Sequence, residues 1–174
     1  MSYSLYRLSV PGFIAMLNNF KAWLDKAAAQ KDEAVLIEAR LAPDMFALAR
    51  QIQIASDAAK GAAARLTGAD APAMADTEAS FAELKQRCDK TIAYLESVDP
   101  AAYDAGASRE IVITFPNGAG MRFDGVTFLT GFAVPNFYFH AAAAYAILRN
   151  QGVEIGKADF LMHLAPHMFG PPEQ

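Results

Sequence analysis

The chain has 174 residues, of which 53% are hydrophobic, and it carries a net charge of −4. This length is typical of one domain with one core, so we expect a single domain over residues 1–174. Because the net charge is negative, the chain lacks the excess of basic residues that nucleic-acid-binding proteins carry, and we exclude nucleic acid as a partner. The single cysteine cannot form an internal disulfide or fill a cysteine-rich metal site. The three histidines are enough in number for one metal site.

The N-terminal residues lack the apolar run of a signal peptide, so we expect a cytoplasmic protein. Residues 125–148 contain no charged side chain and are long enough to span a bilayer. They include Gly131, Pro135 and Asn136, however, and alanines dominate their centre. These features favour a buried helix in a globular core, and we expect no membrane partner.

Apolar residues recur at three- and four-residue steps over residues 3–30, which predicts the first long helix. Pro11 lies near its start, which leaves two alternatives open. Either the helix begins there with Ser9 as its cap, or an earlier turn is kinked at Pro11. A short helical piece is expected next, over residues 32–41.

The sequence Pro43-Asp44 predicts the start of the second long helix. Proline disfavours helical geometry at the residue before it, and Asp44 is a suitable N-cap. An apolar stripe with helical spacing follows, and it includes Ile52. Gly68 and the loop after it end the helix.

The third long helix has Asp76 or Thr77 as its expected cap, and Asp99-Pro100 stops it. Cys88 falls in the apolar stripe of this helix, where no histidine or other base is close in sequence. We therefore expect a buried and chemically inert thiol.

After the third helix, the pattern changes from helical to β. Residues 110–115 are rich in β-branched and aromatic side chains, and residues 116–118 (Pro-Asn-Gly) favour a turn. Asp-Gly at 124–125 is a second turn sequence. We expect strands at 110–115, 121–124 and 126–129, which form a small hairpin.

The fourth long helix is expected over residues 132–151, and a short tail helix over residues 157–164. On a helical wheel, Asn136 and His140 share one face, which is otherwise apolar. Four long amphipathic helices with one insert predict an all-α bundle, with a small β-hairpin insert before the last long helix.

Three stretches carry a resemblance to a known group of proteins. They are Arg40-Leu41-Ala42-Pro43-Asp44-Met45-Phe46, the run Pro135-Asn136-Phe137-Tyr138-Phe139-His140, and residues 144–149 with 152–157 after them. Together they resemble the DinB-like, or YfiT-like, superfamily of four-helix bundles, and within it an uncharacterised bacterial family of unknown function.

This resemblance implies a DinB-like four-helix bundle with one long crossover, often dimeric. It also implies a divalent metal, such as nickel or zinc, held in metal-binding members by three histidines from helices two and four. Two of these form a His-x-x-x-His pair on helix four. Some of those members are thiol-dependent transferases.

Carried onto this chain, the three histidine positions of the superfamily read Gln51, Asn136 and His140, with Gln53 as the alternative to Gln51. Gln51 shares its side of the helix with the apolar stripe, so we expect it to face inward. An amide oxygen is a weak ligand for nickel or zinc. We therefore expect no metal and no cofactor, and a binding pocket formed by Gln51, Asn136 and His140.

His140 has a simpler interpretation, which is a core histidine bonded to Asn136 or to a facing helix. The two other histidines, His163 and His167, have the spacing of a metal-binding pair on a helix. Pro166 lies between them and disfavours a regular helix there.

Three functions remain open, and whether the protein is an enzyme is uncertain. The first is a bundle that binds a small molecule or a protein partner between helices two and four. The second is a divalent-metal enzyme, a transferase or hydrolase, with an incomplete ligand set. The third is a purely structural protein. A homodimer is expected as well, since Ile54, Tyr138 and Tyr145 point away from the inward faces of their helices.

Overall fold

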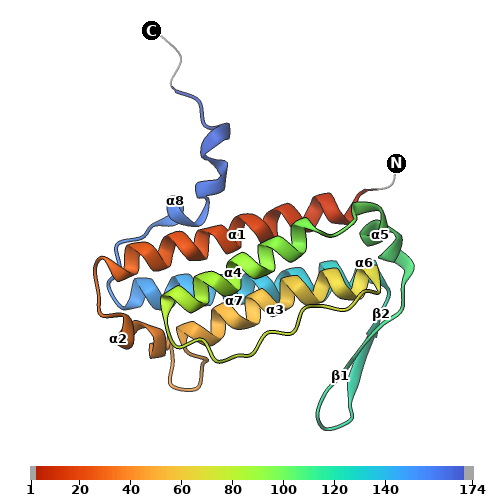
Figure 1. The fold of residues 1–174 in the computed structure, drawn as a ribbon, viewed down its shortest axis with the longest axis horizontal. Helices are drawn as coiled ribbons and strands as arrows, with labels where there is room; N and C mark the ends of the chain where they lie inside the picture. Colours follow the sequence, from red (N-terminus) through yellow and green to blue (C-terminus); the bar gives the residue numbers. More distant parts are fainter. Residues whose placement is uncertain (1–2, 171–174) are drawn as a thin grey trace.

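The computed structural model of the protein describes residues 3–170. Long helices build a bundle (Figure 1), which confirms the expected helical fold. They are α1 (Leu5–Ala28), α3 (Leu48–Thr67), α4 (Phe81–Glu96) and α7 (Val134–Asn150). A short helix, α2 (Glu33–Glu38), lies between the first two.

The connection between α3 and α4 is the long crossover of the bundle. Figure 1 shows α3 and α4 pointing in the same direction. Residues 69–80, which connect the two helices, run back along the bundle. α3 packs most extensively on α7, and α1 packs on α4. Gly68 ends α3 in the left-handed conformation, with φ of 76°.

The first helix includes Pro11 rather than starting there. Its N-cap is Ser4, whose side chain accepts a hydrogen bond from the Arg7 N–H. Ser9 is therefore not a cap. Its buried hydroxyl donates to the Leu5 carbonyl at 2.7 Å and lies 2.9 Å from the hydroxyl of Tyr103.

The second long helix starts later than expected, at Leu48, so Asp44 is not its N-cap. The N-cap position is occupied by Ala47, which makes no side-chain capping bond. The Leu48 N–H instead donates to the Ala39 carbonyl at 2.9 Å. The carbonyl at the C-terminus of α2 thus takes the place of a local N-cap side chain. Sequence spacing does not reveal such a contact between two helix ends.

The helix α4 also starts later than expected, at Phe81. Ser80 is its cap, and its side chain accepts from the Glu83 N–H at 3.2 Å. The Glu83 carboxylate in turn accepts from the Ala79 N–H at 2.7 Å. Asp76, one expected cap, instead forms ion pairs with arginine side chains.

The predicted hairpin is present. The strands β1 (Ile111–Thr114) and β2 (Gly120–Phe123) pair antiparallel, with Ile111 opposite Phe123. The turn contains Gly118 with φ of 83°, a conformation that glycine adopts without strain.

The expected third strand at 126–129 is wrong, because these residues are helical. They form α6 (Gly125–Phe128) and the start of the π-helical turn η2 (Leu129–Ala133), which leads into α7. Asp124 caps α6 by accepting from the Thr127 N–H at 2.7 Å. A Cβ on Gly125 would lie 1.9 Å from the Gly106 carbonyl oxygen. The Asp-Gly pair therefore marks a cap and a close approach of backbones, not a hairpin turn.

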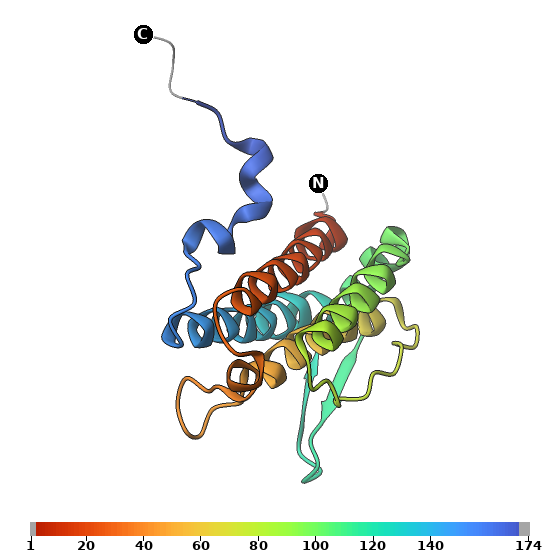
Figure 2. The same ribbon diagram turned by 60° about the vertical axis from the view of Figure 1, so that its left-hand side comes forward.

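Two short elements, α5 (Pro100–Ala105) and η1 (Gly106–Ser108), connect α4 to the hairpin. After α7, α8 (Lys157–Phe160) packs against α1, where the Trp23 indole N–H donates to the Asp159 carbonyl at 3.1 Å. The last element, η3 (Met162–His167), extends away from the bundle (Figures 1 and 2).

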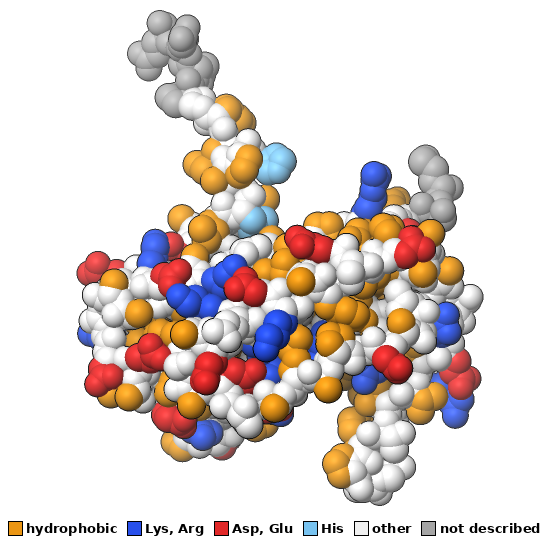
Figure 3. Space-filling view, viewed as in Figure 1, with side chains coloured by type: hydrophobic (Ala, Val, Ile, Leu, Met, Phe, Trp, Pro, Cys, Tyr) orange, Lys and Arg blue, Asp and Glu red, His pale blue; other side chains and the backbone are white. Residues whose placement is uncertain are grey.

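The exposed tail carries apolar side chains as well as His163 and His167, as Figure 3 shows. Pro166 lies inside the single 3₁₀ segment that bears both histidines, so they are not on a regular α-helix. None of the helices between residues 3 and 170 is both long and apolar enough to cross a membrane.

Cys88 is fully buried, as expected, and burial raises the pKa of its thiol to about 12. The predicted outward face at Tyr138 and Tyr145 is wrong, because both side chains pack towards α1. The Tyr145 ring lies 5.6 Å from that of Trp23, and the Tyr138 hydroxyl lies against Gly12. Ile54 is half-buried.

Candidate functional site

The contact between α3 and α7 places His140 opposite Gln51. Ala55 and Ala59 on α3 and Ala144 on α7 are fully buried, and such small side chains let two helices approach closely. Gln51 lies one turn before Ala55, and His140 lies one turn before Ala144. His140 is 7% exposed and Gln51 is 1% exposed.

A hydrogen bond joins these two side chains. The His140 Nδ1 lies 2.7 Å from the Gln51 Oε1, and the Gln51 Nε2 donates to the Phe46 carbonyl at 3.0 Å. Because a carbonyl only accepts, the amide nitrogen of Gln51 must face Phe46 and its oxygen must face His140. The proton of neutral His140 is therefore on Nδ1, and Nε2 carries a free lone pair.

The electrostatic surroundings keep His140 neutral. Burial, and then the positive charge of Arg50, lower the pKa of the imidazole below its ordinary value of 6.5. Arg50 is held nearby by an ion pair with Asp76 and by a hydrogen bond to Gln53. At neutral pH, His140 thus presents a hydrogen-bond acceptor, not a cation.

Asn136, the third residue expected at this site, does not join the pair. It is half-buried, and its amide makes no hydrogen bond to any residue between 3 and 170. Gln53 belongs to a different network, in which it donates to Glu78 at 2.9 Å. The structure thus brings Gln51, but not Asn136 or Gln53, to His140. Gln51 is also the partner on a facing helix that is expected if His140 is simply a core histidine.

The donor set is a poor fit for nickel or zinc. Both polar groups of the Gln51 amide are already used, by His140 and by the Phe46 carbonyl. This leaves one imidazole nitrogen, whereas such sites use three or four protein ligands. Within the described chain, no three His, Cys, Asp or Glu side chains gather in a ligand set.

Two exposed aromatic residues contact the pair, Phe46 through its backbone carbonyl and Phe139 through its ring. Phe46, whose carbonyl holds Gln51, is 53% exposed, and Phe139 is 59% exposed. The Phe139 ring stands edge-on to the His140 ring, with centroids 5.2 Å apart. The arrangement combines one imidazole acceptor with apolar ring surface, which suits recognition of a planar molecule that donates a hydrogen bond.

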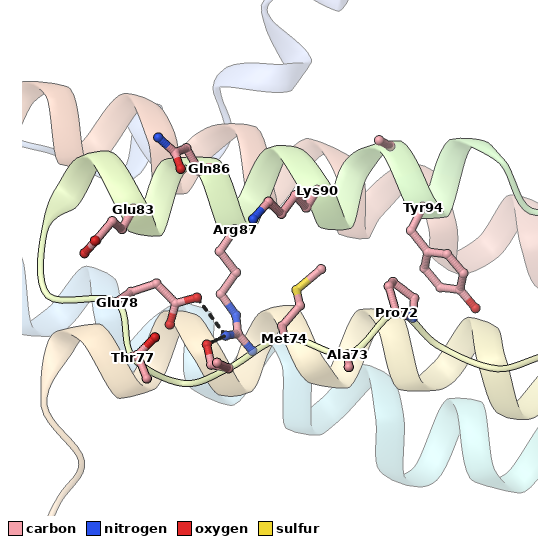
Figure 4. A pocket seen from close by; sticks show the side chains of 12 residues that line it. Pro72, Ala73, Met74, Thr77, Glu78, Glu83, Gln86, Arg87, Lys90 and Tyr94 are labelled. Carbon is pink, nitrogen blue, oxygen red and sulfur yellow. Dashed lines mark hydrogen bonds and ion pairs between the residues drawn. The ribbon is translucent and has the colours of Figure 1, made fainter.

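The two cavities that stand out in residues 3–170 lie away from His140. The larger has a volume of about 680 Å³ and lies between α4 and residues 69–80 (Figure 4). The smaller, about 260 Å³, lies on the hairpin. Neither is lined by Gln51, Asn136 or His140.

Arg87, whose role the sequence did not reveal, lines the larger cavity. Its side chain is 1% exposed, and it pairs with Asp57, Asp76 and Glu78. These carboxylates and its hydrogen bonds raise the pKa of the guanidinium despite burial. The available signal was an arginine directly beside Cys88, in the apolar stripe of α4.

The fold places the protein among DinB-like helical bundles. A crystal structure of a DinB family member protein from Shewanella denitrificans matches with a TM-score of 0.82 and 42% sequence identity. The match covers 98% of this chain and 94% of that one.

The model of a family described as "Domain of unknown function (DUF1993)" matches residues 5–161. The chain belongs to this DUF1993 family, which confirms the resemblance found in the sequence. No curated protein matches the chain.

Proposed function

We propose that this protein is a metal-independent binding protein whose ligand contacts His140 between α3 and α7. The observation that supports it best is the chain of hydrogen bonds from the Phe46 carbonyl through Gln51 to the His140 Nδ1. This chain leaves the Nε2 lone pair as the polar group that is free to accept from a ligand.

The surrounding side chains indicate the kind of ligand. Phe139 offers exposed ring surface beside the imidazole. The ligand that fits is a small planar molecule with an N–H or O–H donor directed at Nε2. Asn136 supplies an amide one turn away, at the edge of the same face.

The first test is elemental analysis of protein purified without a histidine tag. We expect less than stoichiometric nickel, zinc or iron. Stoichiometric metal that is lost in His140→Ala would overturn the proposal in favour of a divalent-metal enzyme.

The second test is a thermal-shift screen of planar heterocycles and phenols against the protein. We expect a hit whose melting-temperature shift disappears in His140→Ala. His163→Ala is the matched control, because it removes an exposed histidine from the tail and should keep the shift. If His140→Ala is simply less stable and no compound shifts the wild-type protein, the site is structural and the proposal fails.

We also propose that the protein is a homodimer in the cytoplasm. The tail supports the dimer, because Met168 and Phe169 are 80% and 92% exposed and would gain from a covering partner. The single, buried cysteine suits a reducing compartment. Light scattering after size-exclusion tests the dimer, and a monomer at high concentration would refute it.

A further inference from the structure

The cavity between α4 and residues 69–80 is separate from the His140 site and has the size of a small-molecule pocket. Its volume is about 680 Å³, within the range of roughly 300–1,000 Å³ that is usual for ligand sites. One wall is the face of α4 that bears Arg87, Lys90 and Tyr94, and the other is the crossover (Figure 4).

Two polar atoms on the α4 wall are buried without a hydrogen-bond partner in the described structure. They are the Nε of Arg87 and the hydroxyl of Tyr94. The other nitrogens of Arg87 are used, with Nη1 and Nη2 bonded to carboxylates and carbonyls. An unpaired buried polar group is costly, so native structures seldom keep one without a reason.

The positive and negative charges around Arg87 are equal in number, but Lys90 is not part of this ion-paired network. The ion-paired network contains three carboxylates and three cations, which are Asp57, Asp76, Glu78, Arg50, Lys60 and Arg87. Lys90 makes no ion pair with any residue between 3 and 170, and its amine points towards Arg87 in Figure 4. The cavity therefore contains a cation that is free to meet an anion.

The carboxylate of Glu83 does not neutralise Lys90. It accepts hydrogen bonds at the start of α4, from the Ala79 N–H, and these bonds lower its pKa. Seven residues separate it from Lys90, which is about 10 Å along a helix. The Glu83 carboxylate is therefore already engaged and does not occupy the anion position beside Lys90 and Arg87.

The spacing along α4 sets the shape of a ligand. Arg87, Lys90 and Tyr94 lie at steps of three and four residues, so they share one face of the helix. Lys90 and Tyr94 are about 6 Å apart along the axis. Met74, Pro72 and Ala93 supply apolar surface to the same cavity. Burial raises the pKa of the Tyr94 phenol, which therefore remains a hydrogen-bond donor at neutral pH.

The crossover is hydrogen-bonded to the helices of the bundle mainly through its second half. Residues 75–78 are tied to the bundle through Asp76, Glu78 and the Ala75 carbonyl. Residues 70–73 make no hydrogen bond to any other part of the described chain, and Met74 touches Thr91 only through sulfur. The part of the crossover that faces Tyr94 can thus shift to uncover the two unpaired atoms without breaking an ion pair.

We propose that this cavity binds an elongated monocarboxylic acid, with its carboxylate at Lys90 and the Arg87 Nε–H and a second oxygen at the Tyr94 hydroxyl. The carbon chain between these groups lies against Met74, Pro72 and Ala93. Such a ligand would satisfy both unpaired donors and the free ammonium at once.

The test is isothermal titration calorimetry with ω-hydroxyhexanoate, hexanoate and ω-hydroxyhexylamine. We expect ω-hydroxyhexanoate to bind several-fold more tightly than hexanoate, and the amine not to bind. Lys90→Met should weaken ω-hydroxyhexanoate binding about tenfold or more, because it removes a charged hydrogen bond. Tyr94→Phe should lower its affinity to that of hexanoate and leave hexanoate binding unchanged.

Lys85→Met is the matched control. It changes the net charge equally but lies on the side of α4 that pairs with Asp25 of α1, and it should bind as the wild type does. Circular dichroism melting curves verify that each variant is folded. The proposal is overturned if the amine binds as well as the acid, if Lys90→Met binds like the wild type, or if no acid binds. These outcomes do not bear on His140, since none of its contacts lines this cavity.

Discussion

The polar pair between α3 and α7 and the polar network beneath the crossover differ in how completely they are paired. The Gln51 amide accepts a hydrogen bond from the His140 Nδ1–H and donates one to the Phe46 carbonyl, so all three groups are paired. Arg87 contacts three carboxylates and still leaves its Nε unpaired. Two packed helices fix the geometry of the first cluster, whereas charges hold an irregular segment over the second. A cluster held by charges should depend more strongly on each of its members.

The largest expected effect is on stability and comes from Arg87→Met. This change leaves Asp57, Asp76 and Glu78 without their shared buried partner, and breaking a buried ion pair costs about 3–5 kcal/mol. Because the carboxylates are partly exposed, we expect a loss of about 3 kcal/mol in the free energy of unfolding, measured in urea. A loss below about 1 kcal/mol would show that the network contributes no more than surface ion pairs do.

A smaller loss is expected from Gln51→Leu, which leaves the His140 Nδ1–H and the Phe46 carbonyl unpaired. An unsatisfied buried group costs about 1–3 kcal/mol, and urea unfolding measures the change. A double-mutant cycle with His140→Leu should give a coupling of about 1 kcal/mol. Additive effects of the two changes would mean that the hydrogen bond does not stabilise the fold.

The smallest effect is the dependence of stability on pH. The folded pKa of His140 is below its ordinary value of 6.5, so the unfolded state binds the proton first as the pH falls. The free energy of unfolding is therefore unaffected by this group above that value. It should decline as the pH falls from 6.5 towards the lowered pKa, by about 1.4 kcal/mol per unit of difference.

Urea unfolding of the wild type and of His140→Gln between pH 7.5 and pH 5.5 measures this contribution, with pH values chosen around the ordinary histidine pKa of about 6.5. The wild-type curve should fall with acidification, and the variant should be flatter. Parallel curves would mean that other groups cause the decline.

Sequence spacing was sufficient for the long helices and for the hairpin, since each depends on a local pattern. It was not sufficient where a distant contact replaced a local one. Leu48 begins α3 through a bond to Ala39, not through the expected cap Asp44. The residues after Asp124 are helical, and Gly125 there packs against the distant Gly106 backbone.

At the candidate site, too, local helical spacing was informative, whereas contacts between distant residues were mostly not predicted. Gln51 was placed inward from its side of the helix, and it does meet His140. Asn136 shares the face of His140 but makes no hydrogen bond with the pair, because the backbone position does not determine where an amide points. Arg87 was missed because its partners come from α3 and the crossover, at separations that no helical period links.

The close contacts at Gly106 and Gly125 also determine which part of the hairpin can vary in length. A Cβ on Gly106 would lie 2.2 Å from the Leu66 carbonyl oxygen, so the backbone on both sides of the hairpin is locked against the end of α3. The tip around Gly118 has open space about it. Residues inserted at the tip would lengthen the hairpin while its base kept its position, which makes this turn the natural point for grafting a foreign peptide onto the bundle.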